Sequence, residues 1–510
     1  METRQHRLPN KFEAALPIIV LLIIMIASYL LGWGVDAHIP VLIAAVVAVI
    51  IGKVCGFTYQ EILDGATNAL SRTMEAILVL FCIGTLIGSW EFAGTIPAVV
   101  FYGLKVITPQ LFLPTACIIC AIIGVSLGSS WTVTGTVGIA FMSVGAAMGI
   151  NPAITAGMCI SGAYCGDKMS PLSDTTNLAA ATGQTGLFDH VRAMISTTIP
   201  SMIIAIILYA VVGFIYGGSN YDPSVGQALC DAIVDHYDHM SLILLLPIAI
   251  LIFACVMKVP AIPGVLLATL TGVILSVIFQ GASLYDVINM CHYGYGGYVE
   301  DAGVDNEMAV TLLSRGGMDS MNWTINLVVI AVGFGGILEK IGAVESLMGG
   351  LIHKVKKPWH ACLTVILTSF VCDWTMCDQY LAIIIPGQMY MKKFDELGLA
   401  RNMLSRSVED CGTLWSPMCP WNSCGAYQSG VLQMSPFAYG PFAFMNIINP
   451  ILAILSARWG GNILFADGSY TSFFGKLKQG PVAAAPVDAH EEALKNLEAL
   501  RAAGAYKSLK

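Results

Sequence analysis

The chain has 510 residues and a formal net charge of −8 at pH 7. Charged residues make up 11% of it and hydrophobic residues 56%, whereas soluble domains carry roughly 25% and 45–50%. This composition excludes an ordinary soluble protein and indicates an all-α polytopic membrane protein. Nucleic-acid binding is also disfavoured, because no basic patch interleaved with aromatic residues is present.

Basic residues precede the first apolar run, so the N-terminus is expected to be cytoplasmic. We expect the first two crossings at 14–32 and 39–52. Mixed charges at 53–73 indicate a cytoplasmic loop or a surface helix, and a third crossing is expected at 74–100.

Two apolar stretches predict re-entrant hairpins. The run 111–149 is too short for two full crossings and a turn, which need about 40 residues plus the turn. A hairpin with its tip at 128–135 fits this length. The stretch 360–391 has basic residues at both ends, so both ends should be cytoplasmic, and its tip is expected at 373–378.

The other crossings follow from the same signals of length and charge. They are expected at 151–177 (broken), 193–217, 240–257, 260–280 and 322–338, with two more between Asp410 and Arg458. The tail after them predicts a short cytoplasmic amphipathic helix. The total is about ten crossings plus two hairpins.

A polar motif, SGAYCGDKMSPLSDTTN (161–177), interrupts the longest uncharged run of the sequence. Charged side chains at bilayer depth are costly, so they normally face water, pair with each other or carry an ion. The dense Gly, Ser, Thr and Pro content predicts a broken helix, whose free carbonyl and hydroxyl groups suit a small cation. The alternative is an ordinary polar loop between two helices.

The motif has a counterpart in the second half of the chain. CGDKMSP at 165–171 matches CGTLWSP at 411–417, and Gly88, Glu91 and Gly94 match Gly336, Glu339 and Gly342 in the same order. The tips share Trp-Thr, at 131–132 and 374–375. These matches indicate a duplication.

The predicted topology gives the two repeats opposite orientations in the membrane, because the first repeat runs outward and the second runs inward. We therefore expect two inverted-topology repeats, each with a hairpin and a discontinuous helix that meet near the midplane. The predicted division is N-terminal spans and loop (1–73), repeat 1 (74–217), linker spans with an acidic external loop (218–321), repeat 2 (322–457) and a cytoplasmic tail (458–510).

Oxygen-bearing side chains of both halves are the candidate ligands for a hard cation such as sodium. They are Thr132, Asp167, Ser170, Ser173, Asp174, Thr175, Thr176 and Asn177 in the first half, and Asp373, Thr375, Asp378, Asp410, Thr413, Ser416 and Asn422 in the second. Asp174, Ser170 and Asn177 are singled out as sodium ligands. Asp174 is expected to lie deeper after the Ser-Pro break, and one carboxylate that binds either sodium or a proton gives exchange.

Several of these residues also have structural interpretations. Asp174 is also suited to cap the following helix, and Lys168 is suited to an ion pair with Asp167. Asp373 and Asp378 are either ion ligands or residues of a water-exposed tip. Glu91 and Glu339 are interpreted as anchors at a membrane face.

Other signals do not indicate an enzyme. Gly124–Gly128 fits G-x-S-x-G without placed catalytic partners, and no phosphate-binding G-x-x-x-x-G-K-[ST] is present. Cys117 and Cys120 lie in an apolar run without a second ligand pair. The nine histidines fall mainly in loops or at span ends, where bland roles are expected. No cofactor is expected.

The sequence resembles the NhaC-type sodium/proton antiporter family of the ion transporter superfamily. SGAYCGDKMSPLSDTTNLAAATG (161–183), LLSRGGMDSMNWTI (312–325) and SVEDCGTLWSPMCPWNSCGAY (407–427) carry the likeness. It implies inverted repeats with re-entrant hairpins, often in homodimers, and exchange of sodium for protons. Cys165, Cys411, Trp415 and Cys419 depart from the expected pattern, which leaves the substrate open.

The resulting hypothesis is a secondary-active sodium/proton antiporter of a bacterial inner membrane with both termini cytoplasmic. Its partners are sodium, protons and the lipid bilayer. The alternative is a transporter of a small organic acid or amino acid coupled to sodium or protons. That alternative needs an anion site, such as a helix N-terminus, Lys168 or Arg315 directed at a carboxylate.

Overall fold

The computed structural model describes residues 6–33, 35–106, 108–219, 223–237, 239–257, 259–302, 309–310, 313–314, 316–480, 487–503 and 506. Arg315 lies outside them. Six helices in this part of the chain are long and apolar enough to span a membrane, or seven if the bent pair α23–η5 and α24 counts as one span. The protein is therefore an all-α multi-pass membrane protein, and the expected ten crossings remain a prediction.

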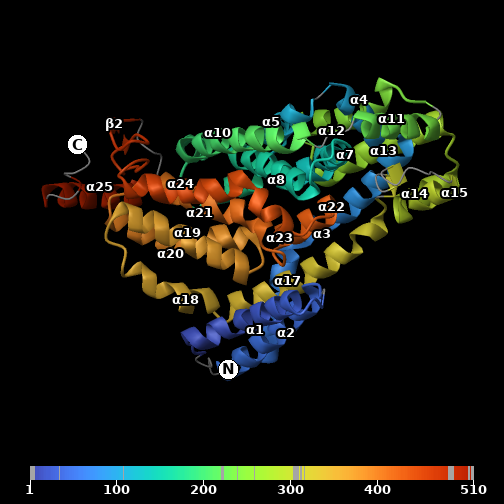
Figure 1. The fold of residues 1–510 in the computed structure, drawn as a ribbon. Helices are drawn as coiled ribbons and strands as arrows, with labels where there is room; N and C mark the ends of the chain where they lie inside the picture. Colours follow the sequence, from blue (N-terminus) through green and yellow to red (C-terminus); the bar gives the residue numbers. More distant parts are fainter. Residues whose placement is uncertain are drawn as a thin grey trace.

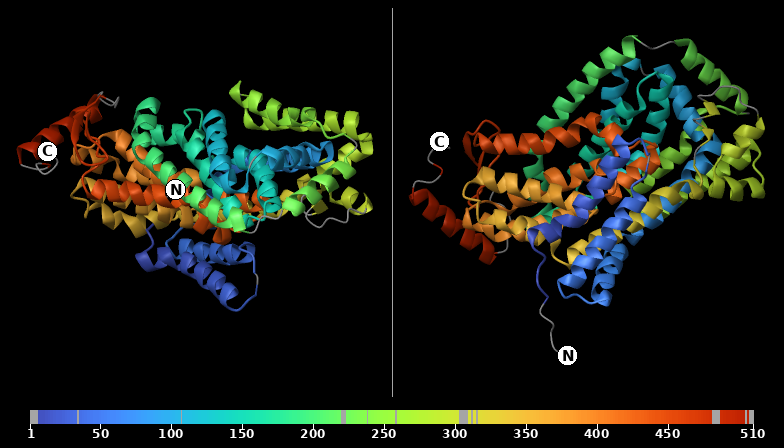
Figure 2. Two further views of the ribbon diagram at one scale, coloured as in Figure 1. Left: turned by 45° about the horizontal axis from the view of Figure 1, so that its top comes forward. Right: turned by 60° about the horizontal axis from the view of Figure 1, so that its bottom comes forward.

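Helices α1 (Lys11–Leu30) and α2 (His38–Val54) pack on each other and form a pair at one edge of the molecule (Figures 1 and 2). The next helix, α3 (Tyr59–Ala93), begins where the sequence suggested a loop or surface helix. Thr58 and Glu61 form a capping box there, so the helix starts early and continues unbroken. The expected boundary at residue 73 falls inside α3.

Helix α3 crosses α17 (Asn322–Lys340) near the centre of the fold (Figure 1). Gly65 and Gly336 lie at the crossing, and a Cβ added to Gly65 would come within 2.8 Å of the Gly336 carbonyl oxygen. The close approach of the two backbones thus depends on both glycines. After each helix the chain turns at a left-handed glycine, Gly94 (φ 81°) and Gly342 (φ 73°), into α4 (Thr95–Val106) and α18 (Ala343–Ile352).

The remaining helices of the first half contain two breaks. The chain turns between α5 (Pro109–Leu127) and α6 (Ser130–Val133), which continues through the π-helical turn η1 (Thr134–Gly138) into α7 (Ile139–Ala147). Helix α8 (Pro152–Met169) packs along α5 and is separated by a short turn from α9 (Asp174–Thr182). The long helix α10 (Leu187–Ser219) then covers α5 and α24.

The middle of the chain lies at one end of the molecule, around α14 and α15 in Figure 1. Its elements are α11 (Pro223–His236), η2 (Leu242–Leu245), α12 (Leu246–Val256), α13 (Ala261–Gln280), α14 (Leu284–Tyr293), α15 (Gly296–Ala302) and η3 (Met318–Met321). Helix α13 packs along α3.

The second half follows the element order of the first. Helices α19 (Pro358–Thr375) and α20 (Gln379–Glu396) pack against each other and against α21 (Arg401–Trp415). A turn with η4 (Ser416–Met418) separates α21 from α22 (Ser423–Leu432). The half ends with α23 (Pro436–Tyr439), η5 (Gly440–Phe442) and α24 (Phe444–Arg458), which bends away from the preceding turn by 60°.

The C-terminal segment contains the expected helix, α25 (Val487–Ala502), which packs on α20 (Figure 1). It also contains an antiparallel pair of short strands, β1 (Ser469–Thr471) and β2 (Leu477–Gln479), which the sequence did not indicate. Asn496 donates to the Asp395 carbonyl of α20 at 3.1 Å, and within the C-terminal segment Arg501 of α25 donates to Asp467 at 2.6 Å. The tail is thus docked to the membrane-spanning body.

Candidate functional site

The predicted break in the first half is present at residues 170–173, between α8 and α9. Its polar side chains largely hold the turn itself. The Ser170 hydroxyl accepts from the Leu172 N–H at 3.2 Å, and the Ser173 hydroxyl caps α9 and lies 2.9 Å from that of Thr175. Asn177 is exposed and donates to the Ser173 carbonyl at 2.6 Å. Ser170 and Asn177 therefore have less freedom to bind sodium than the sequence suggested.

Asp167, one turn before the break, is buried and reaches the turn after α5. Its Oδ2 accepts hydrogen bonds from the Ser130 N–H at 3.0 Å and the Ser130 hydroxyl at 2.7 Å. Its Oδ1 is buried near the Ser173 hydroxyl and accepts no hydrogen bond within normal distance from the described residues. This oxygen is available to a cation. Ser130 was not a predicted site residue, although it lies in the predicted tip.

Asp174 does not occupy the deep position expected for it. Its side chain is exposed, and one carboxylate oxygen accepts from the Thr175 N–H at 2.8 Å. The other accepts from the Tyr380 hydroxyl at 2.5 Å. The cap of α9 is Ser173, so the capping interpretation of Asp174 is also wrong. The break changes the direction of the chain, so a later residue is not a deeper one.

The second half joins its own turn to its own break in a similar way. Asp373, at the end of α19, is buried, and its Oδ1 accepts from the Asn422 amide at 3.3 Å. Asn422 caps α22, whose first N–H group, at Ser423, donates to the Cys377 carbonyl at 2.9 Å. The Asp373 Oδ2 is buried and accepts no hydrogen bond from the described part of the chain.

Some of the other predicted residues use their side chains in hydrogen bonds, whereas others have no hydrogen-bond partner among the described residues. Asp378 is buried and caps α20 through the Leu381 N–H at 3.0 Å, so its tip is not water-exposed. The Thr132 hydroxyl donates to Ser129 at 3.0 Å, and the Ser416 hydroxyl donates to the Thr413 carbonyl at 2.8 Å. The buried hydroxyls of Thr375 and Thr413 have no hydrogen-bond partner among the described residues.

Lys168 connects the two halves. It forms an ion pair with Asp410 on α21, and both side chains are fully buried. The expected pair with Asp167 is therefore wrong. The same Asp410 oxygen accepts from Thr197 on α10 at 2.9 Å and from Asn449 on α24 at 2.8 Å.

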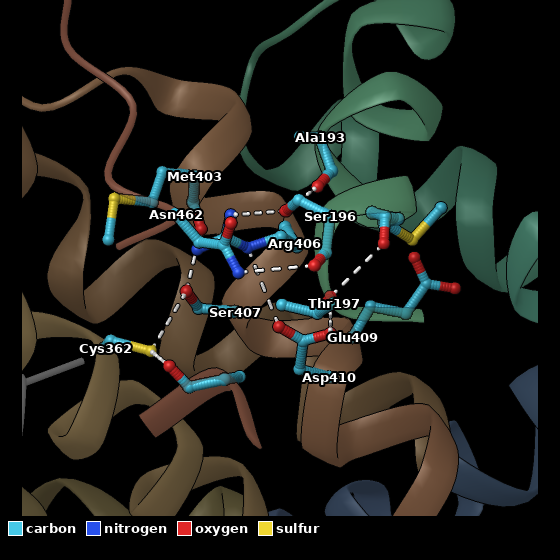
Figure 3. Close-up of polar contacts among 12 residues, drawn as sticks. Ala193, Ser196, Thr197, Cys362, Met403, Arg406, Ser407, Glu409, Asp410 and Asn462 are labelled. Carbon is cyan, nitrogen blue, oxygen red and sulfur yellow. Dashed lines mark hydrogen bonds and ion pairs between the residues drawn. The ribbon is translucent and has the colours of Figure 1, made fainter. Parts of the chain in front are cut away.

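Arg406 is the second cationic side chain that offsets the charge of the Asp410 carboxylate. Its Nε lies 3.6 Å from the second Asp410 oxygen, and its guanidinium donates to the Ser196 hydroxyl at 3.2 Å. Figure 3 shows Arg406 and Asp410 of α21 grouped with Ser196 and Thr197 of α10, whereas the Glu409 carboxylate is directed away from Arg406. Asp410 is thus held by two cationic side chains.

Glu409 makes a separate set of contacts. One carboxylate oxygen lies 2.6 Å from Nε2 of His190, and the other accepts from the Thr176 hydroxyl at 3.2 Å. All three side chains are fully buried. His190 is thus an exception to the expectation that the histidines lie in loops or at span ends without a functional role. The charge-rich run RNMLSRSVED (401–410) was the available signal, since a buried helix rarely holds so many ionisable groups without partners.

A further contact joins the turn region after α5 in the first half to the helix that follows the break in the second half. Trp131 of α6 stacks on Tyr427 of α22 with ring centroids 4.1 Å apart, and the Tyr427 hydroxyl donates to the Trp131 carbonyl at 2.6 Å. The matched residues Glu91 and Glu339 are not equivalent. Glu91 is fully buried, which contradicts an anchor at the membrane face, whereas Glu339 pairs with Arg72 at 2.5 Å.

The arrangement suits a hard cation as a transported species. Asp167 and Asp373 each have a buried oxygen without a hydrogen-bond partner among the described residues, and each lies next to the helix break of its own half. Carboxylate and hydroxyl oxygens are the ligands that such cations prefer. Asp410 and Thr176 are engaged in contacts between the halves, so they are left out of this ligand set.

Comparison with known proteins gives consistent results. The model of the Na+/H+ antiporter family matches residues 162–460. The chain is 34% identical to the Na(+)/H(+) antiporter NhaC of Alkalihalophilus pseudofirmus, over 84% of this chain and 91% of that protein. It is 33% identical to the malate-2H(+)/Na(+)-lactate antiporter of Bacillus subtilis, over 91% and 97% of the two chains. It is also 34% identical to the arginine/ornithine antiporter ArcD of Halobacterium salinarum, over 90% and 94%.

Proposed function

The chain belongs to the Na+/H+ antiporter family, and on that premise we propose that it exports sodium in exchange for protons by alternating access. It is a transporter, not an enzyme. The observation that supports this proposal best is the pair of buried carboxylates, Asp167 and Asp373, each with one oxygen free beside a broken helix. Free carboxylate oxygens in a dry interior attract a small cation strongly.

Alternating access further requires two states, and inverted repeats supply them in many transporters. The proposal of two inverted repeats, at 74–217 and 322–457, is supported by the shared element order. In each half a left-handed glycine follows the first helix, a turn separates two helices, and a second helix breaks at a Ser-Pro. Both boundaries of the first repeat fall inside helices, α3 and α10, so they mark sequence likeness only.

For sodium we propose Asp167 and Asp373 as the charged ligands, with the hydroxyls of Thr375 and Thr413 as candidates for neutral ones. This set replaces Asp174, Ser170 and Asn177. An inner-membrane location with both termini cytoplasmic is supported by the basic residues that flank the α18–α19 and α20–α21 connections. The family resemblance supports a homodimer, which light scattering in detergent would test.

The alternative is exchange of an organic acid or amino acid, as the names of two relatives suggest for those proteins. Such a substrate brings a carboxylate that needs a cationic partner. Lys168 is already paired with Asp410, which weakens its candidacy. Arg315 lies outside the described residues.

The test uses purified protein in proteoliposomes with a pH-sensitive dye inside. Sodium added outside should move protons across the membrane in the wild type, and Asp167→Asn should abolish this movement. If sodium moves no protons in the wild type, the proposal is wrong. Malate, lactate, arginine and ornithine would then be tested for sodium- or proton-dependent exchange.

A further inference from the structure

His190 and Glu409 form a buried pair that the sodium ligands do not use. His190 is near the start of α10 in the first half, and Glu409 is on α21 in the second. Their contact of 2.6 Å between Nε2 and Oε2 holds a proton directly between the two groups. Both side chains have no solvent exposure. A buried acid–base pair of this kind is costly, so a role in moving charge is expected.

The surroundings of His190 satisfy both of its protonation states. Its Nδ1 lies 2.8 Å from the Ser405 hydroxyl, which also lies 3.2 Å from the Asn402 carbonyl. When His190 is neutral, the Ser405 hydroxyl donates to Nδ1. When His190 is protonated at both nitrogens, the same hydroxyl rotates and donates to the Asn402 carbonyl, and its oxygen accepts from Nδ1. Neither state leaves a buried polar atom without a partner.

Glu409 has a similar two-position neighbour in Thr176. The Thr176 hydroxyl lies 3.2 Å from the Glu409 carboxylate and 3.1 Å from the Lys168 carbonyl. A hydroxyl has one proton to donate, so it bonds the ionised carboxylate or the carbonyl. Lys168 is adjacent to Asp167 at the end of α8. The Thr176 hydroxyl therefore links the protonation state of the His190–Glu409 pair to the helix break beside the free Asp167 oxygen.

Other charged side chains lie on the helices packed around the His190–Glu409 pair. Helix α8 provides Asp167 and Lys168, and α21 itself provides Arg406 and Asp410. The other acidic, basic and histidine side chains on the elements packed there are Asp174 on α9, Asp189 and Arg192 on α10, His360 and Asp373 on α19, Lys392, Lys393, Asp395 and Glu396 on α20, Arg401 on α21 and Arg458 on α24. Lys168 and Arg406 compensate Asp410. The direct partner of Glu409 that can take up a proton is His190.

We propose that the His190–Glu409 pair is the proton-binding site of the exchanger, distinct from the sodium-binding carboxylates, and that Thr176 transmits its protonation to the break beside Asp167. This inference rests on the proposed sodium/proton exchange. One added proton makes the pair either imidazolium with carboxylate or imidazole with carboxylic acid. In a buried cluster this added positive charge disfavours a sodium ion at Asp167, and release of the proton favours it.

The experiment separates two transport modes in proteoliposomes. Sodium-driven proton movement is measured with the internal dye, and sodium/sodium exchange is measured with radioactive sodium at equal pH on both sides. Glu409→Gln should reduce proton movement at least tenfold while sodium/sodium exchange continues. His190→Gln should shift the pH dependence of proton movement, and Thr176→Val should slow coupled exchange more than sodium/sodium exchange.

Matched controls are the exposed residues in Glu75→Gln and His353→Gln, which should behave as the wild type in both modes. Folding of each variant is checked by gel filtration and thermal unfolding. The inference is overturned if Glu409→Gln keeps wild-type proton movement, or if a folded Glu409→Gln loses both modes together. A wild type without sodium-driven proton movement would instead reject the proposed function, so the two failures are distinguishable.

Discussion

Gly128 and Cys377 both adopt the left-handed conformation, with φ of 64° and 57°, at the turn between two helices in their respective halves. Each turn contacts the broken helix of its own half. A Cβ added to Gly128 would lie 2.6 Å from the Ser173 nitrogen, and the Cys377 carbonyl accepts from the Ser423 N–H at 2.9 Å. The turns and the breaks thus form one contact in each half.

We expect Gly128→Ala to disrupt the first of these contacts. The left-handed conformation alone costs an alanine roughly 1–2 kcal/mol, and the clash with residues 172–173 adds to this cost. Gly281→Ala is the matched control, because Gly281 is also left-handed (φ 67°) but has nothing within 4 Å of its added Cβ. The temperature of thermal unfolding and the rate of sodium/proton exchange should both fall more for Gly128→Ala than for Gly281→Ala. Equal effects of the two changes would contradict a close contact at Gly128.

The Lys168–Asp410 pair predicts an order of stabilities. Asp410→Asn leaves two buried cations without a carboxylate, whereas Lys168→Met leaves Asp410 with Arg406, Thr197 and Asn449. Removing one partner of a buried pair costs about 3–5 kcal/mol, and we expect Asp410→Asn to be the more severe change. The temperatures of thermal unfolding in detergent show which of the two variants is less stable.

Lys393→Met serves as the control for this comparison, since its pair with Glu396 is largely exposed on the carboxylate side. Such surface pairs contribute about 0–1 kcal/mol. A larger loss for Lys168→Met than for Asp410→Asn would show that Arg406 does not compensate Asp410.

Sodium binding should depend on Asp167 far more than on Asp174. Asp167 is buried with one free oxygen, whereas Asp174 is exposed and bonded to Tyr380. We expect Asp167→Asn to weaken sodium binding at least tenfold, or about 1.4 kcal/mol, and Asp174→Asn to change it little. Calorimetry with purified protein gives both constants, and the reverse order would return Asp174 to the ligand set.

The contact between α25 and the segment before β1 should weaken in acid. Burial favours the neutral form of Asp467, but hydrogen bonds from Ser469 and Arg501 outweigh burial and lower its pKa below the usual 3.8. The contribution of Asp467 to docking is therefore complete above pH 3.8 and is lost as the pH falls through the lowered pKa. Because the pair with Arg501 is partly exposed, this contribution is expected to be below about 1 kcal/mol.

Hydrogen exchange of α25 at neutral pH tests the same contact without acid. Asp467→Asn should increase exchange in α25 relative to the wild type and leave α8 and α21 unchanged. Asp64→Asn, at an exposed carboxylate of α3, is the control. Unchanged exchange in α25 would show that the Asp467–Arg501 pair does not hold α25 against the segment before β1.

The sequence predicted local features better than contacts between distant residues. The break at 170–173, the turn near 128 and the helix in the tail follow from local composition, and all three are present. The start of α3 at Tyr59 was less well predicted, because hydropathy indicates depth in a membrane and does not mark where a helix begins.

The ionic contacts were harder to predict because they join the two halves. Lys168 pairs with Asp410, and Thr176 and His190 pair with Glu409, across more than 200 residues. A single sequence does not show which distant helices pack together. The exposed position of Asp174 has a similar origin, since it depends on the direction that the chain takes after the break.

The separation of Lys168 from Asp410 along the chain also affects how the protein is made. The two residues are 242 positions apart, and at roughly 5–20 residues per second the ribosome adds Asp410 about 12–48 s after Lys168. During this interval the first half enters the bilayer with its lysine unneutralised, which is costly. We therefore expect stable insertion of α8 to await synthesis of α21, and a nascent chain that stops before Arg401 to be held by the insertion machinery or degraded.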